Sequence, residues 1–316
     1  MKTLKVVTIT FNPAIDLTGS VSILNKNSVN SMDSGNLHPA GKGVNVAQVL
    51  CDLGAQVTVT GFLGEENQDS FVQAFSNMGA KNAFIRVAGA TRINVKLVEK
   101  NGDVTDLNFP GCCIGIKEIE ALEKKLYTLM QDNDVFVMAG SLPLGLSAQQ
   151  AAKWIALLRE HGKTVFFDSS NQALAIGVKS CPNFIKPNEM ELAQLAKLNG
   201  DNIDPNNLTE VKAYAEKLEA QGIDNVVISL GSEGVIWLNS GKWIGVRPPK
   251  QKVVSTVGAG DSLVAGLCWG HINHWPSQRT LSFAAAIGAL AVTQVGVGVS
   301  DLDVLLDLTK QVQLKN

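Results

Sequence analysis

Val135-Phe136-Val137-Met138 and Thr164-Val165-Phe166-Phe167 are two short apolar runs, and residues 148–160 form an amphipathic stretch between them. Short runs rich in β-branched and aromatic residues are typical of buried strands, and the stretch between them has the hydrophobic period of a helix. Two strands joined by a crossover helix lie parallel in one sheet. This stretch therefore predicts a parallel sheet that is covered by helices.

The same alternation continues in both directions along the chain. Further strands are predicted at residues 6–10, 57–60, 183–185 and 226–229, and a second amphipathic helix at 116–130. Repeated alternation predicts an α/β fold with a doubly wound, mostly parallel sheet flanked by helices. Ligands bind such sheets at the carboxyl ends of the strands, and Asp16, Ser141, Asn188 and Gly231 each follow a predicted strand.

Two stretches interrupt the alternation. Residues 17–38 and 92–107 resemble extended ribbons with Asn, Gly and Asp turns, and neither is repetitive or rich in Pro and Ser as a linker would be. We therefore expect a single domain over residues 1–316, with a small β-structured lid formed by these two insertions. Such a lid would exclude water from a reaction site.

Composition excludes several classes of protein. Of the 316 residues, 45% are hydrophobic and 18% charged, which is ordinary for a soluble globular enzyme. A formal net charge of -2 without a basic run argues against nucleic acid as a partner. Five cysteines without a C-x-x-C pair favour a reduced, cytoplasmic protein. Residues 283–299 are uncharged, but we expect a buried helix and a glycine loop there, not a membrane span.

The segment Gly258-Ala259-Gly260-Asp261 precedes an apolar stretch that has the pattern of a helix. A turn without bulky side chains lets backbone N–H groups close on an anion, and the dipole of the following helix adds to their field. Asp261 places a carboxylate beside that site. One chemistry needs both features, because amides can hold a transferring phosphate while a base takes the proton of the attacking hydroxyl. The segment predicts a small-molecule kinase.

Three further motifs each allow two interpretations. One motif is Ala40-Gly41-Lys42-Gly43, followed by Asn45. It is either a binding site for sugar hydroxyls or a phosphate group, or it is an ordinary helix start. Asn188 and Glu191 either hold the waters of a phosphate-bound Mg²⁺ or only follow the charge preference of a helix start. Arg92 is either a phosphate clamp or an exposed strand charge.

Neither common nucleotide fingerprint is present. The glycines near Lys42 do not have P-loop spacing, and no G-x-G-x-x-G opens a helix after a strand, which weakens a dehydrogenase interpretation. Residues 231–234 most simply predict a hairpin turn, with a nucleotide-facing loop as the alternative. Asp16, close behind Asn12-Pro13, is either a turn cap or a ligand.

Taken together, these motifs resemble the ribokinase-like carbohydrate kinases, the PfkB family, over essentially the whole chain. The matching segments are the family's C-terminal signature at 258–261, its N-terminal glycine region at 40–45, its N-x-x-E magnesium motif at 188–191 and its G-S-L-P segment at 140–143. The resemblance is strongest to the sugar-phosphate branch of the family. It implies ATP-dependent phosphorylation of fructose 1-phosphate at its 6-hydroxyl, which gives fructose 1,6-bisphosphate. Tagatose 6-phosphate or fructose 6-phosphate as the substrate, or a non-catalytic sugar-phosphate sensor, are the alternatives.

The resemblance also implies a role for each matching residue. The sugar's hydroxyls are bound by Asp16, Gly41, Asn45 and Ser141, and its phosphate by Lys42 and Arg92. Asp261 is the general base, beside an anion hole formed by residues 257–260, including Gly258, Ala259 and Gly260. The ATP side is lined by Lys186, Asn188, Ser229, Gly231, Thr256, Gly258 and Gly260. Glu191, together with Asn188, organises Mg²⁺ through water. A homodimer through the lid is expected, and some relatives also use a monovalent cation such as K⁺.

Overall fold

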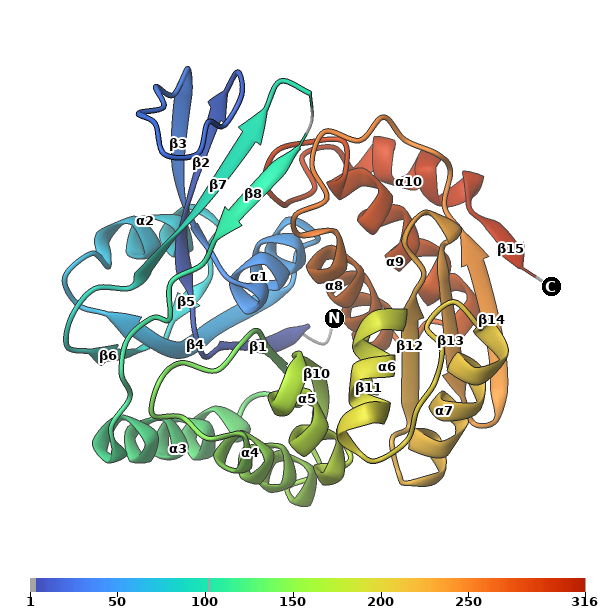
Figure 1. Ribbon diagram of the computed structural model, residues 1–316. Helices are drawn as coiled ribbons and strands as arrows, with labels where there is room; N and C mark the ends of the chain where they lie inside the picture. The colour runs from blue at the N-terminus through green and yellow to red at the C-terminus, as the bar shows by residue number, and fades with distance from the viewer. Residues whose placement is uncertain (1–3, 102, 316) are drawn as a thin grey trace.

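The computed structural model describes residues 4–101 and 103–315, so that Gly102 of the expected lid lies outside the described residues. Within these residues, eleven strands form one large sheet in the body of the protein (Figure 1). Its strands are β1 (Lys5–Thr10), β4 (Gln56–Gly64), β5 (Lys81–Asn82), β6 (Ile85–Val87), β9 (Val135–Ala139), β10 (Thr164–Asp168), β11 (Phe184–Ile185), β12 (Asn225–Ser229), β13 (Val235–Asn239), β14 (Lys242–Arg247) and β15 (Gln313–Lys315). The sheet is parallel from β4 through β1, β9, β10 and β11 to β12.

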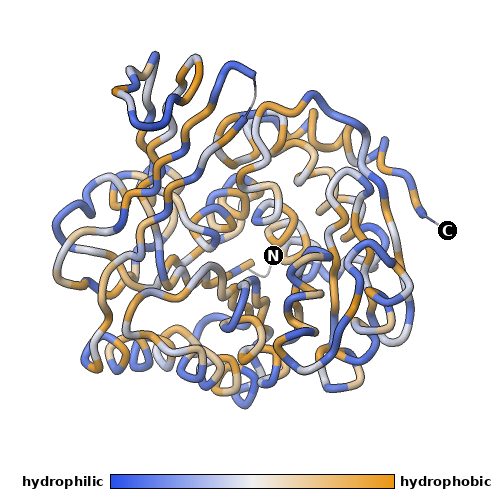
Figure 2. Tube along the Cα trace, viewed as in Figure 1, coloured by the Kyte–Doolittle hydropathy of each residue, from blue (hydrophilic) through white to orange (hydrophobic). Residues whose placement is uncertain are grey.

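Helices cover both faces of the sheet and enclose one hydrophobic core on each side (Figure 1). One face carries α1 (Lys42–Asp52), α2 (Asp69–Asn77), α8 (Ala259–Ile272), α9 (Ser277–Ala291) and α10 (Leu302–Gln311). The other carries α3 (Ile116–Met130), α4 (Ala148–Glu160), α5 (Asn171–Gly177), α6 (Glu189–Leu198) and α7 (Leu208–Ala220). Neighbouring strand residues point to opposite faces, so Val135 and Val137 join the first core while Phe136 and Met138 join the second. Figure 2 shows hydrophobic residues concentrated along these central strands.

The predicted alternation is confirmed, including the two helices at 116–130 and 148–160. The expected hairpin at 231–234 is also confirmed, because a short 3₁₀ turn there joins the antiparallel strands β12 and β13. The further antiparallel strands β14 and β15 were not predicted. Residues 283–291 belong to the buried helix α9, as expected. None of the helices in the described part of the chain has the length and apolarity to cross a membrane.

A second sheet of four strands projects from the body (Figure 1), and we call it the lid. It consists, in spatial order, of β3 (Ser34–Ala40), β2 (Ala14–Val21), β7 (Arg92–Glu99) and β8 (Val104–Leu107). The expected insertions at 17–38 and 92–107 supply most of it, although β2 begins at Ala14 and β3 ends at Ala40, both nearer the body. The register places Asp16 beside His38 and Asn94, and Leu17 beside Leu37 and Val95. The lid therefore has one polar and one apolar face.

The placement of Asp16 corrects one expectation. Asp16 was expected to follow the first strand at the edge of the main sheet, but β1 ends at Thr10 and Asp16 lies inside β2. The chain bends at residues 11–13 and re-enters an extended conformation, so this carboxylate belongs to the lid. Its side chain also does not cap the turn, because it binds partners on β7.

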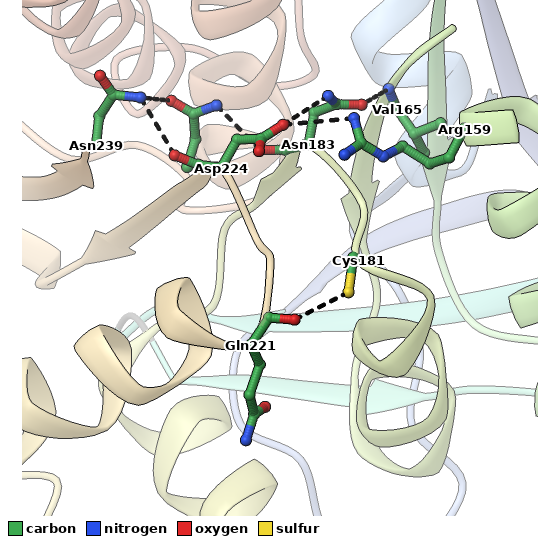
Figure 3. A network of polar contacts seen from close by, with 8 residues as sticks. Arg159, Val165, Cys181, Asn183, Gln221, Asp224 and Asn239 are labelled. Carbon is green, nitrogen blue, oxygen red and sulfur yellow. Dashed lines mark hydrogen bonds and ion pairs between the residues drawn. The ribbon is translucent and has the colours of Figure 1, made fainter. Parts of the chain in front are cut away.

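Side-chain hydrogen bonds hold the short strand β11 at its amino end (Figure 3). Asn183 accepts from the N–H of Val165 at 2.8 Å and donates to Asp224 at 2.8 Å. Asn225 donates to the carbonyl of Asn183 at 3.0 Å and accepts from Asn239 at 2.7 Å. These bonds link the four strands β10 to β13, which compensates for the few ladder bonds that a two-residue strand can make. The loops at the opposite ends of these strands are therefore well anchored.

Helices α8 and α9 pack at a distance that only small side chains allow. A Cβ atom at Gly266 would lie 2.5 Å from the Cα of Ala284, and one at Gly270 would overlap Thr280. Since α8 carries Asp261 in its first turn, the packing of α8 against α9 helps to fix the position of that carboxylate relative to the sheet.

Gly266→Ala should lower the free energy of unfolding by about 1–3 kcal/mol, because the added methyl group forces the two helices apart. Gly288→Ala is the matched control in α9, where a Cβ atom would make only ordinary contacts, the nearest at 3.5 Å. This control should be neutral or stabilising by up to about 1 kcal/mol, because alanine favours a helix. Urea denaturation measures both. Equal losses in the two variants would contradict the packing argument.

Candidate active site

The N-terminus of α8 lies at the carboxyl ends of the parallel strands. Gly258 precedes the helix with φ +79°, which is the left-handed region that favours glycine, and a Cβ atom there would overlap the side chain of Val297. No side chain caps this helix, and the N–H of Ala259 makes only a long hydrogen bond, 3.4 Å, to the carbonyl of Thr256. Ala259 and Gly260 form the first residues of α8, so the predicted glycine turn lies directly at a helix start.

Asp261 lies in the first turn of α8 and is 7% exposed. Its Oδ2 accepts a hydrogen bond of 2.7 Å from the side-chain amide of Asn45 on α1. Burial raises the pKa of Asp261 to about 6; the charge of Lys42 opposes that shift and the charge of Asp168 reinforces it. A carboxylate with this pKa is ionised at neutral pH and is still a better proton acceptor than an ordinary aspartate.

Asp168 is bound between two lysines at the end of β10. Its Oδ2 lies 3.2 Å from Lys42 Nζ, and its Oδ1 lies 3.6 Å from Lys186 Nζ. Burial alone would raise the pKa of this carboxyl group, but Lys186 and Lys42 outweigh it and lower the pKa below its ordinary value. Burial would likewise lower the pKa of Lys42, yet the charges of Asp168, Asp261 and Glu191 raise it. Three carboxylates from different parts of the chain therefore act on Lys42.

Sequence reasoning missed Asp168. A signal existed, because Asp168 directly follows the predicted strand 164–167, just as Ser141 follows the strand before it. In the structure Asp168 is 3% exposed, and a carboxylate so deeply buried requires charged partners. The rule that ligand sites lie at strand ends would have found it.

Lys186 and Gly41 also lie at this site. A Cβ atom at Gly260 would be 3.4 Å from Lys186 Nζ, which places that lysine beside the anion turn. Gly41 precedes α1 with φ +136°, and a Cβ atom there would lie 2.9 Å from Thr10 and 3.2 Å from Pro13. The close approach of these segments therefore needs glycine at position 41.

Asn188 and Glu191 form a reciprocal capping box at the start of α6. The N–H of Glu191 donates to Asn188 Oδ1 at 2.7 Å, and the N–H of Asn188 donates to Glu191 Oε2 at 3.0 Å. The helix-start interpretation of this motif is thus confirmed. The charge of Glu191 nevertheless acts on Lys42, so the same carboxylate also faces the site.

The remaining ATP-side candidates are Ser229, Gly231 and Thr256. Ser229 ends β12 and forms a bridge to Asn188, and its N–H donates to the carbonyl of Pro187 at 3.1 Å. Gly231 begins the 3₁₀ turn after β12 with φ +54°. Thr256 is exposed, two residues before Gly258.

Arg92 joins the lid to the body. Its guanidinium donates to the carbonyl oxygens of Asn12 at 3.0 Å, Pro13 at 3.3 Å and Phe109 at 2.9 Å. These bonds use three of its five N–H donors, so among the described residues two remain for a ligand. Arg92 is half-buried and is not a plain exposed strand charge. Next to it, Asn12 donates to Ser141 Oγ at 3.3 Å.

Asp16 is buried on the polar face of the lid and has two partners on β7. Its Oδ1 accepts from the amide of Asn94 at 3.2 Å, and its Oδ2 lies 2.7 Å from Lys96 Nζ. Lys96 was missed in the sequence. Strand alternation places it on the same face as Arg92 and Asn94, so the signal was present in the ribbon at 92–107.

The acidic groups suit a cation that arrives with phosphates. In residues 4–101 and 103–315, no three His, Cys, Asp or Glu side chains are grouped to hold a metal ion on their own. Asp168 Oδ1, however, is buried without a hydrogen bond, and the charges of Asp168 and Glu191 converge on Lys42. Carboxylate oxygens and water are the ligands that Mg²⁺ prefers beside substrate phosphates.

Comparisons with known proteins agree with this geometry. The sequence profile described as "pfkB family carbohydrate kinase" matches residues 2–303. A 1-phosphofructokinase from Vibrio cholerae is 55% identical over 99% of this chain and 97% of its own, and one from Escherichia coli K12 is 45% identical over 98% of both. A tagatose-6-phosphate kinase from Staphylococcus epidermidis is 32% identical over 98% of this chain and 99% of its own.

Solved structures share the fold. The phosphofructokinase-2 from Escherichia coli in complex with fructose-6-phosphate superposes with a TM-score of 0.86 at 22% identity, over 97% of this chain and 98% of the other. A protein described as a putative phosphofructokinase from Staphylococcus aureus gives a TM-score of 0.79 at 27% identity, over 98% of both chains. The α/β fold with a small separate sheet is therefore common to these proteins.

Asp261 should titrate with a pKa of about 6, and Lys42→Met should raise that pKa further, because the lysine charge favours the ionised carboxylate. The carbon NMR signals of labelled aspartate carboxyl groups measure this titration. Lys153→Met, at an exposed position on α4, is the control and should leave the pKa unchanged. An unshifted or lowered pKa in Lys42→Met would contradict the proposed proximity.

Proposed function

The chain belongs to the pfkB family of carbohydrate kinases, and we propose that it transfers the γ-phosphoryl group of ATP to the 6-hydroxyl of fructose 1-phosphate. The observation that carries this proposal is the buried carboxylate of Asp261 in the first turn of an uncapped helix. The choice of sugar rests on the two 1-phosphofructokinases that match the chain over nearly its whole length.

In the proposed reaction, Asp261 takes the proton of the 6-hydroxyl as the oxygen attacks phosphorus. Its raised pKa suits this role, because a base works best when its pKa lies near the working pH. The N–H groups of Gly258, Ala259 and Gly260 stabilise the negative charge on the transferring phosphoryl group, and the dipole of α8 adds to their field. Proton transfer and charge stabilisation are thus supplied by one helix start.

The sugar phosphate is anchored on the other side of Asp261. Lys42 and Arg92 provide cations for the phosphate that the sugar already carries, which a neutral sugar would not need. Its hydroxyl groups meet Asp16, Gly41, Asn45 and Ser141. Lys42 already forms an ion pair with Asp168 in the free protein. The phosphate of the bound sugar would therefore contact a lysine that keeps Asp168 as a second partner.

ATP is bound by Lys186, Asn188, Ser229, Gly231 and Thr256, on the side of β11 and β12. Lys186 lies beside Gly260 and can meet the phosphates at the anion turn. The Mg²⁺ that accompanies ATP would neutralise charge between its phosphates, with its water ligands held by Glu191 and by Asp168. The charges of both carboxylates act on Lys42, so both lie close to the anion turn and its neighbouring lysines.

Two alternatives remain distinguishable. A non-catalytic sensor predicts a lost base or a blocked anion turn, but Asp261 and Gly258 have the geometry that catalysis needs. A tagatose-6-phosphate kinase is supported by a relative at 32% identity, which is well below the 55% identity of the 1-phosphofructokinase from Vibrio cholerae.

The test is the specificity constant kcat/KM with ATP for fructose 1-phosphate, tagatose 6-phosphate and fructose 6-phosphate. We expect kcat/KM for fructose 1-phosphate to exceed the values for the other two sugars by at least about tenfold. A tenfold preference corresponds to roughly 1.4 kcal/mol of differential transition-state binding. A tenfold preference for fructose 6-phosphate would overturn the choice of substrate. The absence of turnover with all three sugars would favour the sensor.

We also propose that two copies pair through the apolar faces of their lids. Leu37 is 63% exposed, Ile93 42% and Leu107 50%, and all three lie on that face by strand alternation. A contiguous apolar surface of this kind on a soluble protein marks an interaction site.

Leu37→Asp should therefore shift the protein toward monomers in sedimentation velocity experiments, because a charge would be buried in the interface. Leu198→Asp is the control, since Leu198 is similarly exposed but lies on α6, away from the lid. A wild-type protein that is monomeric at all concentrations would contradict the pairing.

A further inference from the structure

Lys96 and Asp16 form an ion pair in the lid that the proposed mechanism does not yet use. Lys96 Nζ lies 2.7 Å from Asp16 Oδ2, and the two side chains are only 14% and 7% exposed. We propose that Lys96 is a positioning residue that allows Asp16 to bind a sugar carrying a phosphate, by balancing the charge of Asp16 rather than by touching the phosphate. This inference rests on the proposed function.

The contacts of Asp16 leave room for a substrate. Each carboxylate oxygen offers two lone-pair positions. Asn94 uses one position on Oδ1 and Lys96 uses one on Oδ2, so one position on each oxygen remains for a hydroxyl group. The two donors, Asn94 and Lys96, lie two residues apart on the same face of β7, and their bonds also prevent the carboxylate from rotating. Asp16 is therefore held ready for two sugar hydroxyls.

The register explains why Lys96 reaches Asp16. Asp16 lies directly opposite Asn94, and Lys96 follows two residues later on the same face of β7. Diagonal neighbours of this kind are within reach of a long side chain. Lys96 lies opposite Asp106 on β8, but its ion pair is made with Asp16 on β2. The Lys96 side chain therefore extends toward the inner strand β2 and not toward the edge strand β8.

A phosphorylated sugar makes this balance necessary. Asp16, Asp168, Glu191 and Asp261 already supply four carboxylates to the proposed site, and the sugar's phosphate adds close to two negative charges. An uncompensated carboxylate on the lid would repel that phosphate as the lid closes. A neutral sugar would bring no such charge, so Lys96 is tied to the class of substrate.

Among the described residues, no other cation forms an ion pair with Asp16. His38 faces Asp16 from β3, but burial, reinforced by Lys96, outweighs the attraction of Asp16 and lowers its pKa, so His38 is neutral at pH 7. The charge of Arg92, on the same strand as Lys96, also acts on Asp16, but its guanidinium bonds backbone carbonyl oxygens and makes no ion pair with Asp16. Lys96 is therefore the cation in direct contact with the carboxylate of Asp16.

The test is a double-mutant cycle between Lys96→Met and Asp16→Asn, with KM measured separately for fructose 1-phosphate and for ATP. Lys96→Met alone should raise KM for the sugar phosphate by at least about tenfold, the lower range for a hydrogen bond to a charged group, while KM for ATP stays within about twofold. In the Asp16→Asn background, Lys96→Met should raise KM for fructose 1-phosphate by less than about threefold, because position 16 no longer carries a negative charge that Lys96 could balance.

Three further variants separate charge from structure. Lys96→Arg keeps the charge and should retain most of the affinity, whereas Lys96→Gln keeps a donor without charge and should behave like Lys96→Met. These two variants carry the test if the Met variant fails to fold. Lys100→Met removes an exposed lysine of the same lid and should leave KM unchanged.

The outcomes are distinct. Losses that are fully additive with Asp16→Asn would overturn the proposal and indicate direct contact between Lys96 and the phosphate. A normal KM in Lys96→Met with a lowered melting temperature would overturn it in favour of a purely structural ion pair. Weak turnover of fructose 1-phosphate by the wild-type protein would instead count against the proposed function, because the cycle presupposes that substrate.

Discussion

The ion pairs of Asp168 with Lys42 and Lys186 are the interaction on which the rest of the site depends. A buried charge without a partner is strongly destabilising, so these three groups must stay together. Lys42 begins α1, Asp168 ends β10, and Lys186 follows β11. The pairing therefore fixes three separate segments around Asp261, whose own pKa depends on burial and on this same set of charges. In the proposed mechanism, one cluster thus positions the cations for both substrates and sets the pKa of the base.

The lid repeats this principle at the other end of the substrate. Its polar face carries the Asp16–Lys96 ion pair, and Arg92 ties its base to the body through backbone carbonyl groups. Its apolar face leaves leucine and isoleucine side chains exposed. A four-stranded sheet can serve both purposes because alternate residues point to opposite sides. Closure over a charged sugar and pairing with a second copy are therefore compatible in one small element.

Much of the fold could be predicted from the sequence because strand and helix periods alternate so regularly. The helix at 148–160 and the strands on either side of it have clear patterns. The anion turn and Asp261 were also evident, because glycines directly before an apolar helix leave its first N–H groups open to an anion. For Asp168 and Lys96 the sequence indicated a position, at a strand end and on one face of a ribbon, but not a role. Their roles come from ion pairs with partners 126 and 80 residues away, and a local pattern cannot identify such distant partners.

The central claim is that Asp261 acts as the general base, and Asp261→Asn tests it most directly. The amide keeps the size of the side chain and its contact with Asn45 but cannot accept the proton of the 6-hydroxyl. We predict that kcat with fructose 1-phosphate falls by at least about a hundredfold, the lower range for loss of a general base, while ATP binds with unchanged affinity. Near-normal turnover in this variant would contradict the role of Asp261 as the base.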